Sequence, residues 1–159
     1  MASIIAGIGE FGFSNNPEVV IQTFALGSCV ALMAYDKTKR IAGLVHIALP
    51  ESSISLEKAA ILPGYFADTA IAYFFKELYR LGASRNNTFL KMAGGARVLN
   101  SSDKFDIGKR NVLAIKKILW KEQLGVIAED VGGEKARTIH FYVASGEIVI
   151  TSGQNKWQI

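Results

Sequence analysis

The chain has few of the residues from which most catalytic and metal sites are built. Its 159 residues include one cysteine, Cys29, and two histidines, His46 and His140. A single cysteine excludes a disulfide within the chain. His140 has no cysteine or second histidine near it in the sequence, so the usual spacing of zinc ligands is missing. The sequence therefore predicts no metal site.

Long apolar runs are also missing. No hydrophobic stretch approaches the ~20 residues that a helix needs to cross a bilayer. The first residues lack a basic region followed by an apolar segment and a small-residue cleavage site, so we expect no secretory leader. Together with the single cysteine, this predicts a protein of the reducing cytoplasm that does not insert into membranes.

The charge has no strong bias, because 18 Lys and Arg face 14 Asp and Glu for a net charge of +4. The basic residues are scattered, as Lys37, Lys58, Lys91 and Arg97 illustrate, and no basic motif is interleaved with aromatics. This pattern predicts no nucleic-acid partner. Half of the residues are hydrophobic and a fifth are charged, which is typical of a globular protein, and the length suits one domain over residues 1–159.

Hydrophobic patterning predicts more strands than helices. We expect strands over residues 3–6, 19–25, 30–35, 41–49, 89–93, 126–130, 138–143 and 147–151. Apolar residues at helical spacing predict helices over residues 64–82 and 108–124. Strands precede the first helix and then mix with helices, which favours an α+β fold over regular βαβ alternation. Residues 51–62 are predicted to be a loop or lid, and residues 154–159 a peripheral tail.

The stretch Gly7–Gly12 matches the letters of a dinucleotide-binding motif, G-x-G-x-x-G. Such a motif needs a helix directly after it, so that the helix N-terminus faces the pyrophosphate. Here the turn-forming residues Ser14–Pro17 follow instead. We therefore interpret the glycines as part of a bent or bulged strand.

The cysteine and one histidine fall on two strands that a short turn joins. If Lys37-Thr38 is a two-residue hairpin loop, Cys29 lies directly opposite His46, with both side chains on one face of the sheet. A free thiol is only a few per cent thiolate at neutral pH, and an imidazole beside it can accept its proton. This register predicts a cysteine–histidine pair, although Lys-Thr is not a favoured sequence for such a loop.

Residues around Cys29 suggest how such a pair would be completed. Gly27 and Ser28 precede the cysteine, and a glycine there allows a sharp turn whose backbone N–H groups can point at a developing oxyanion. A third group is normally needed to orient the imidazole. Thr23, at the end of the preceding predicted strand, can offer a hydroxyl for that purpose.

Cys29, His46 and Thr23 can each also be explained by a purely structural role. A lone cysteine among apolar residues is commonly an inert core residue, and a histidine on an apolar strand is commonly a buried side chain with satisfied hydrogen bonds. Thr23 in a strand agrees with ordinary β-propensity. The residues alone leave catalysis and a non-catalytic interaction module both open.

Several motifs, in order along nearly the whole chain, resemble those of the CheD family of chemoreceptor glutamine deamidases. They are Leu26-Gly27-Ser28-Cys29-Val30, Gly43 with His46 and Leu49-Pro50, Tyr65-Phe66-Ala67-Asp68-Thr69-Ala70, Ala93-Gly94-Gly95-Ala96, Ile107-Gly108-Lys109-Arg110-Asn111, and Asp130-Val131-Gly132-Gly133 with Arg137. The chain departs at Ser145-Gly146, where the family commonly has Thr-Gly.

The resemblance implies hydrolysis of glutamine side-chain amides in methyl-accepting chemotaxis receptors, with Cys29 as nucleophile, His46 as base and Thr23 as the third catalytic residue. It implies a layered α/β sandwich with mixed or antiparallel sheets flanked by helices, related to cysteine-dependent deamidating toxins. It implies no metal or organic cofactor. It also implies a partner, the CheC phosphatase, and the alternative to catalysis is a module that only binds receptors or CheC.

Overall fold

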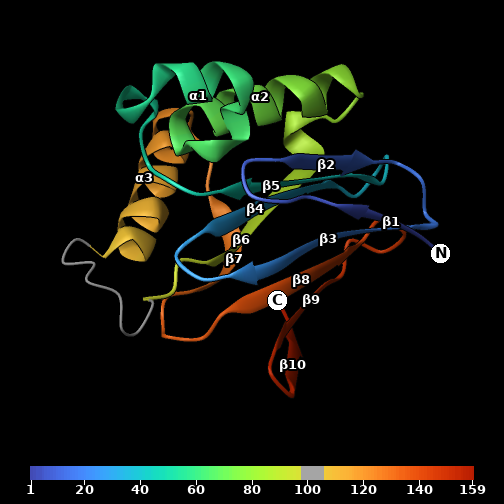
Figure 1. Ribbon diagram of the computed structural model, residues 1–159. Helices are drawn as coiled ribbons and strands as arrows, with labels where there is room; N and C mark the ends of the chain where they lie inside the picture. The colour runs from blue at the N-terminus through green and yellow to red at the C-terminus, as the bar shows by residue number, and fades with distance from the viewer. Residues whose placement is uncertain (98–105) are drawn as a thin grey trace.

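The structure is a computed structural model that describes residues 1–97 and 106–159 (Figure 1). Its strands form two five-stranded sheets. Sheet A has the order β1-β3-β8-β9-β10, with the bounds Ala2–Ile5, Val19–Leu26, Arg137–Tyr142, Ile148–Ser152 and Asn155–Gln158. Sheet B has the order β2-β5-β4-β6-β7, with the bounds Phe11–Ser14, Ile41–Ile47, Val30–Asp36, Thr88–Gly94 and Val126–Val131.

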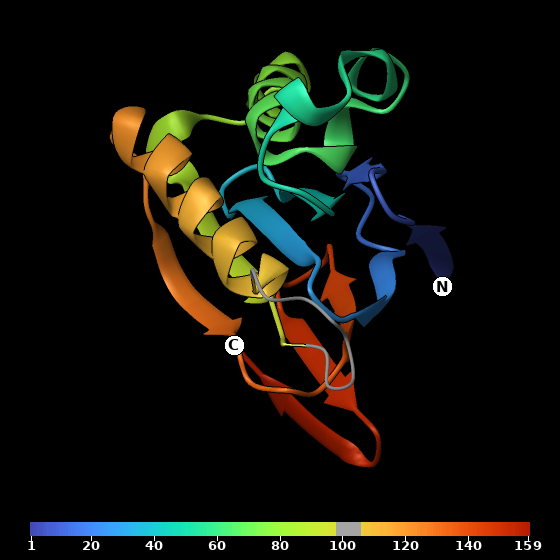
Figure 2. The same ribbon diagram turned by 60° about the vertical axis from the view of Figure 1, so that its left-hand side comes forward.

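The helices lie on one side of sheet B, and sheet A packs on the other side (Figure 1, Figure 2). The α-helices are α1, Leu56–Ile61, α2, Ala67–Arg80, and α3, Ile107–Lys121. The short 3-10 helices are η1, Ser52–Ile54, η2, Pro63–Tyr65, and η3, Arg85–Asn87. Among the described residues, no helix is long and apolar enough to cross a bilayer. The predicted α+β sandwich with mixed sheets and flanking helices is confirmed.

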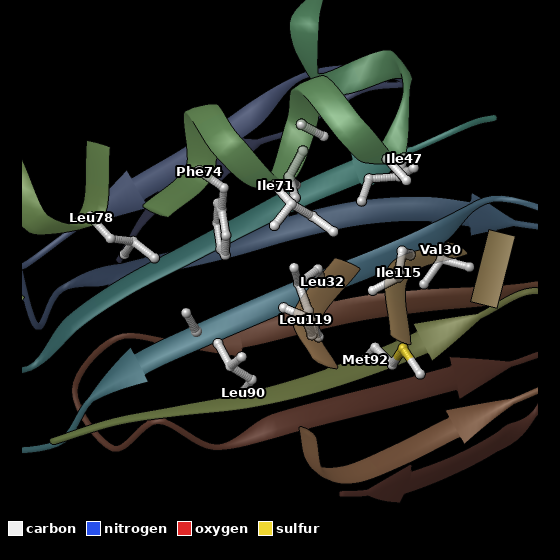
Figure 3. Close-up of a cluster of buried hydrophobic side chains, with 14 of the residues drawn as sticks. Val30, Leu32, Ile47, Ile71, Phe74, Leu78, Leu90, Met92, Ile115 and Leu119 are labelled. Carbon is white, nitrogen blue, oxygen red and sulfur yellow. The ribbon is translucent and has the colours of Figure 1, made fainter. Parts of the chain in front are cut away.

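Strand β4 shows why the central strands of sheet B are apolar at nearly every position. Val30 and Leu32 face the helices and pack with Ile115 of α3, as Figure 3 shows. Ala31 and Met33 alternate with them and pack in the second core, between the two sheets. Because both faces of β4 are covered, its sequence is a continuous hydrophobic run rather than an alternating one.

The predicted two-residue hairpin loop between β4 and β5 is wrong. Asp36 pairs with Ile41, so the loop has four residues, and Ala31 rather than Cys29 lies opposite His46. The buried Asp36 carboxylate fixes this longer loop, because its Oδ1 accepts the backbone N–H groups of two loop residues at 2.9 and 3.0 Å. The shift is by two positions, which keeps each side chain on its predicted face of the sheet.

Two other predictions change. Residues 51–62 are not an irregular loop but contain η1 and α1, and the Ser55 side chain caps α1 by accepting the N–H of Lys58 at 3.2 Å. The tail is not peripheral, because β10 extends sheet A and Trp157 Nε1 donates to Asp130 Oδ2 at 2.5 Å.

The two long helices were predicted to within a few residues of their ends. The predicted single domain, residues 1–159, includes residues 98–105, which lie outside the described residues.

Candidate active site

His46 lies on the face of β5 that looks toward sheet A, and its side chain is only 3% exposed. Thr23 reaches it from β3, in the other sheet, with Thr23 Oγ1 2.7 Å from His46 Nδ1. The same hydroxyl lies 2.6 Å from the carbonyl oxygen of Ala6. Thr23 is fully buried, so its hydroxyl contacts these two groups and no bulk water. The structure thus brings together two of the three predicted side chains.

These two distances determine the tautomer of His46. A carbonyl oxygen can only accept, so the hydroxyl proton of Thr23 goes to Ala6. The hydroxyl then has only lone pairs for His46, and Nδ1 must be the protonated nitrogen that donates to it. In the neutral ring, Nε2 is therefore left with a free lone pair. Among the described residues this buried Nε2 has no hydrogen-bond partner.

Burial also determines the charge of this imidazole. Desolvation lowers the pKa of His46 from 6.5 to about 4, against smaller opposing effects of the Ala6 carbonyl and the Glu10 charge. At neutral pH the ring is therefore uncharged. An uncharged ring with its Nε2 lone pair free is the form that can act as a general base.

The glycine-rich stretch Gly7–Gly12 supports this side of the site. Gly9 N–H donates to the His46 carbonyl at 2.8 Å, and His46 N–H donates to the Glu10 carbonyl at 3.2 Å. The stretch turns at Gly9, whose φ is +78°, and continues into β2. The predicted bent strand is wrong, because the stretch is a turn that joins β1 of sheet A to β2 of sheet B, and this turn fixes the backbone of the histidine.

Cys29 lies in the connection between β3 and β4, Gly27–Cys29, which we call the cysteine loop. Strand β3 ends in an irregularity between Thr23 and Leu26, where Ala25 takes a left-handed φ of +54°. The thiol is half-buried, and burial raises its pKa above the usual value. No hydrogen bond joins Cys29 to His46 within the described part of the chain. The thiol and the imidazole are therefore both neutral.

The cysteine loop is held by its carbonyl groups. Its first carbonyl oxygen, on Gly27, accepts the N–H of Ala96, and its last, on Cys29, accepts the N–H of Gly95, each at 2.8 Å. Its middle carbonyl, on Ser28, accepts Asn111 Nδ2 at 2.9 Å. Over residues 1–97 and 106–159, no group accepts a hydrogen bond from the N–H groups of this loop. Within the described residues, the loop thus has its carbonyls fixed and its N–H donors without acceptors.

Sequence reasoning assigned no site role to Asn111 or to the turn at Gly94–Ala96. In the structure Gly94, at the start of this turn, lies close to the cysteine loop. A methyl group at Gly94 would lie 2.3 Å from the Cys29 carbonyl oxygen. Asn111 had a detectable signal, since it shares the apolar stripe of α3 with Ile115 and Leu119. A polar residue in such a stripe indicates a specific buried hydrogen bond.

No group of three His, Cys, Asp or Glu side chains among residues 1–97 and 106–159 is placed to hold a metal ion. The polar groups around His46 are instead a hydroxyl, backbone carbonyls and backbone N–H groups. This arrangement suits proton transfer and the binding of a developing negative charge.

Comparisons with known proteins agree on one family. A family model described as CheD chemotactic sensory transduction matches residues 48–152. The chain is 48% identical over 162 residues to a probable chemoreceptor glutamine deamidase CheD of Syntrophotalea carbinolica, with 100% of both chains covered. It is 40% identical over 153 residues to a probable chemoreceptor glutamine deamidase CheD 2 of Anaeromyxobacter dehalogenans, with 96% of each chain covered. The family-model match begins after Cys29 and His46, but the match to the first relative spans them. The chain therefore belongs to the CheD family.

Proposed function

We propose that this protein deamidates glutamine side chains of methyl-accepting chemotaxis receptors to glutamate, and so regulates chemotaxis. The relatives' names supply the substrate class. The observation that carries the mechanism is the buried contact of Thr23 with His46, which leaves Nε2 of the imidazole unprotonated. Since such glutamines lie in the cytoplasmic parts of the receptors, we infer that the protein works in the cytoplasm.

The first half of the reaction makes a thioester. His46 Nε2 takes the proton from the Cys29 thiol as the sulfur attacks the carbon of the glutamine carboxamide. The carbonyl oxygen becomes an oxyanion, which the free N–H groups of the cysteine loop stabilise. The imidazolium then protonates the amide nitrogen, the C–N bond breaks, and ammonia leaves a γ-glutamyl thioester.

The second half returns the enzyme to its starting state. His46 takes a proton from water, the hydroxide oxygen attacks the thioester carbon, and the C–S bond breaks. The thiolate recovers its proton from the imidazolium, and glutamate is released. Each step uses water and groups of this chain, and each proton transfer by a positioned base contributes about 10²–10⁴-fold to the rate.

The pKa directions favour general-base catalysis over a preformed thiolate–imidazolium pair. The pKa of Cys29 is raised and that of His46 is lowered, both by burial, so proton transfer between them is unfavourable before substrate binds. Transfer becomes productive when the sulfur is bonding to carbon, because the bound oxyanion then carries the charge.

A second candidate is a module that binds receptors or the CheC phosphatase without catalysis. The observation that favours it is the apolar surface of η1 and α1, where Ile54, Leu56 and Ile61 are 71%, 71% and 80% exposed. Exposed apolar clusters of this kind commonly mark protein-binding surfaces.

The two candidates separate in one assay. A receptor cytoplasmic domain is incubated with the protein, and peptides are examined for the mass gain of about 1 Da that accompanies conversion of a glutamine amide to an acid through a covalent intermediate. Wild type is expected to produce the gain, and Cys29→Ala is not. Full activity in Cys29→Ala would refute the nucleophile. Binding of the receptor by wild type with no mass gain would favour the module.

A further inference from the structure

Asn111 of α3 is a buried residue that contacts the cysteine loop and the residue directly after β5, and it takes no part in the chemical steps proposed above. We infer that it is a positioning residue: by holding the Ser28 carbonyl, it aims the N–H of Cys29 at the developing oxyanion. This inference rests on the proposed function of the site.

One side-chain amide makes both contacts. Asn111 Nδ2 lies 2.9 Å from the Ser28 carbonyl oxygen and 3.0 Å from the Ala48 carbonyl oxygen, so each of its two N–H bonds serves one acceptor. The flipped amide would place Oδ1 against two carbonyl oxygens, which repel it. The donor arrangement is therefore the only one compatible with these neighbours.

The contact with Ser28 fixes the peptide plane that leads into Cys29. The protein has no cis peptide bonds in residues 1–97 and 106–159, and in a trans peptide the C=O and the following N–H point in opposite directions. Holding the Ser28 carbonyl on the side of α3 therefore turns the Cys29 N–H to the opposite side. That N–H has no acceptor in the described part of the chain, and this orientation lets it donate to an oxyanion.

The contact with Ala48 ties the same plane to the strand that carries the histidine. The ladder between β4 and β5 ends at the pair of Val30 and Ile47. Ala48 follows directly, two residues after His46, and beyond this point no strand pairing holds the cysteine loop to β5. Asn111 supplies that connection, so one amide sets the loop against the base.

Packing alone does not explain an asparagine here. Asn111 is 0% exposed, and its Oδ1 has no hydrogen-bond partner among the described residues, which is unfavourable in a buried site. Its neighbours on the buried stripe of α3 are Gly108, Val112, Ile115 and Leu119. A leucine, which branches at the same carbon, would continue the apolar stripe but would leave the Ser28 carbonyl without a donor.

The test compares two reactions of the same thiol. Deamidation passes through an oxyanion, whereas alkylation of Cys29 by iodoacetamide needs the thiolate but no oxyanion. In Asn111→Leu we expect kcat for receptor deamidation to fall about 10- to 100-fold, with KM and the alkylation rate each within about threefold of wild type. The matched control is Ile115→Val, on the same stripe, which should leave both reactions close to wild type.

Two results would overturn the inference: a folded Asn111→Leu that keeps kcat within about threefold, or equal losses in deamidation and alkylation, which indicate a general disturbance of the loop. If Asn111→Leu does not fold, Asn111→Ala gives the same comparison. Should wild type fail to deamidate the receptor, the proposed function is wrong, and ¹⁵N relaxation of the Cys29 amide decides instead. Asn111→Leu is then expected to raise the mobility of that amide, and unchanged mobility would refute the inference.

Discussion

The two halves of the site are held in place by different means. His46 is fixed by a side-chain hydrogen bond to Thr23 that crosses from sheet B to sheet A, and by backbone hydrogen bonds to the stretch before β2. Cys29 lies outside the strands, and its loop is held through its carbonyl groups by donors from the end of β6 and from α3. The base thus depends on the packing of the two sheets, and the nucleophile on a turn and a helix. Apart from Asn111, which contacts both sides, the supports of one half can therefore be disturbed without the other.

The largest effect is expected on the cysteine side, from Gly94→Ala. Gly94 has a φ of +119°, and the new methyl group would lie 2.3 Å from the Cys29 carbonyl oxygen, a backbone atom that cannot move away alone. Backbone strain and the displaced loop should together lower the free energy of unfolding by about 3–5 kcal/mol, with loss of deamidation. Chemical denaturation followed by circular dichroism measures the first quantity.

Gly132→Ala is the matched control for this change. Gly132 also has a left-handed φ, +82°, but a methyl group there meets no atom of residues 1–97 or 106–159 within 4 Å. Its cost should be limited to the backbone conformation, about 1–2 kcal/mol. Equal destabilisation of the two variants would show that contact with the cysteine loop contributes nothing at Gly94.

The second largest effect is expected on the histidine side, where the stability of the protein should depend on pH through His46. In the unfolded chain His46 binds a proton below pH 6.5, but in the folded protein only below about pH 4. Between these values the unfolded state holds more protons, so stability is fully present above pH 6.5 and falls as the pH drops toward 4. The difference in pKa corresponds to about 3 kcal/mol.

The measurement is the free energy of unfolding of wild type and His46→Gln across this pH range. Subtracting the two curves removes the contributions of carboxylates such as Asp36. Burial raises the pKa of that carboxyl, but its hydrogen bonds to backbone N–H groups outweigh burial and lower the pKa overall. As the pH falls from 6.5 to 4, the free energy of unfolding of wild type should drop by about 3 kcal/mol more than that of His46→Gln. Parallel curves would mean that the imidazole titrates as freely in the folded protein as in the unfolded chain.

The sequence predicted the strands and the shared face of the site because both depend on local pattern. Cys29 and His46 were expected on one face of the sheet. Cys29 packs against the core between the sheets, and His46 contacts Thr23 of sheet A. The register was wrong because it depends on loop length, which the buried Asp36 carboxylate and the left-handed φ of Arg40 fix. Neither feature appears in hydrophobic periodicity.

Contacts between layers were not available from local pattern at all. Thr23 was named as a possible orienting residue, but its contact with His46 arises because two separate sheets pack face to face. The same is true of Asn111, which reaches the cysteine loop from a helix 83 residues further along the chain. Such long-range placements follow from the packing of complete layers, which no window of sequence contains.

The smallest effect is expected from Thr23→Val, which removes the hydroxyl while keeping the shape of the side chain. His46 Nδ1–H and the Ala6 carbonyl would each lose a buried partner. We expect a loss of about 1–2 kcal/mol in stability and about a tenfold lower kcat, because the imidazole remains in place but its tautomer is no longer fixed. ¹⁵N shifts of the His46 ring nitrogens report that tautomer directly. Thr23→Ser, which keeps the hydroxyl, should retain the Nδ1-protonated form and most of the activity. If Thr23→Val shows the same ring shifts and kcat as wild type, the contact between the sheets has no part in preparing the base, and burial alone accounts for the state of His46.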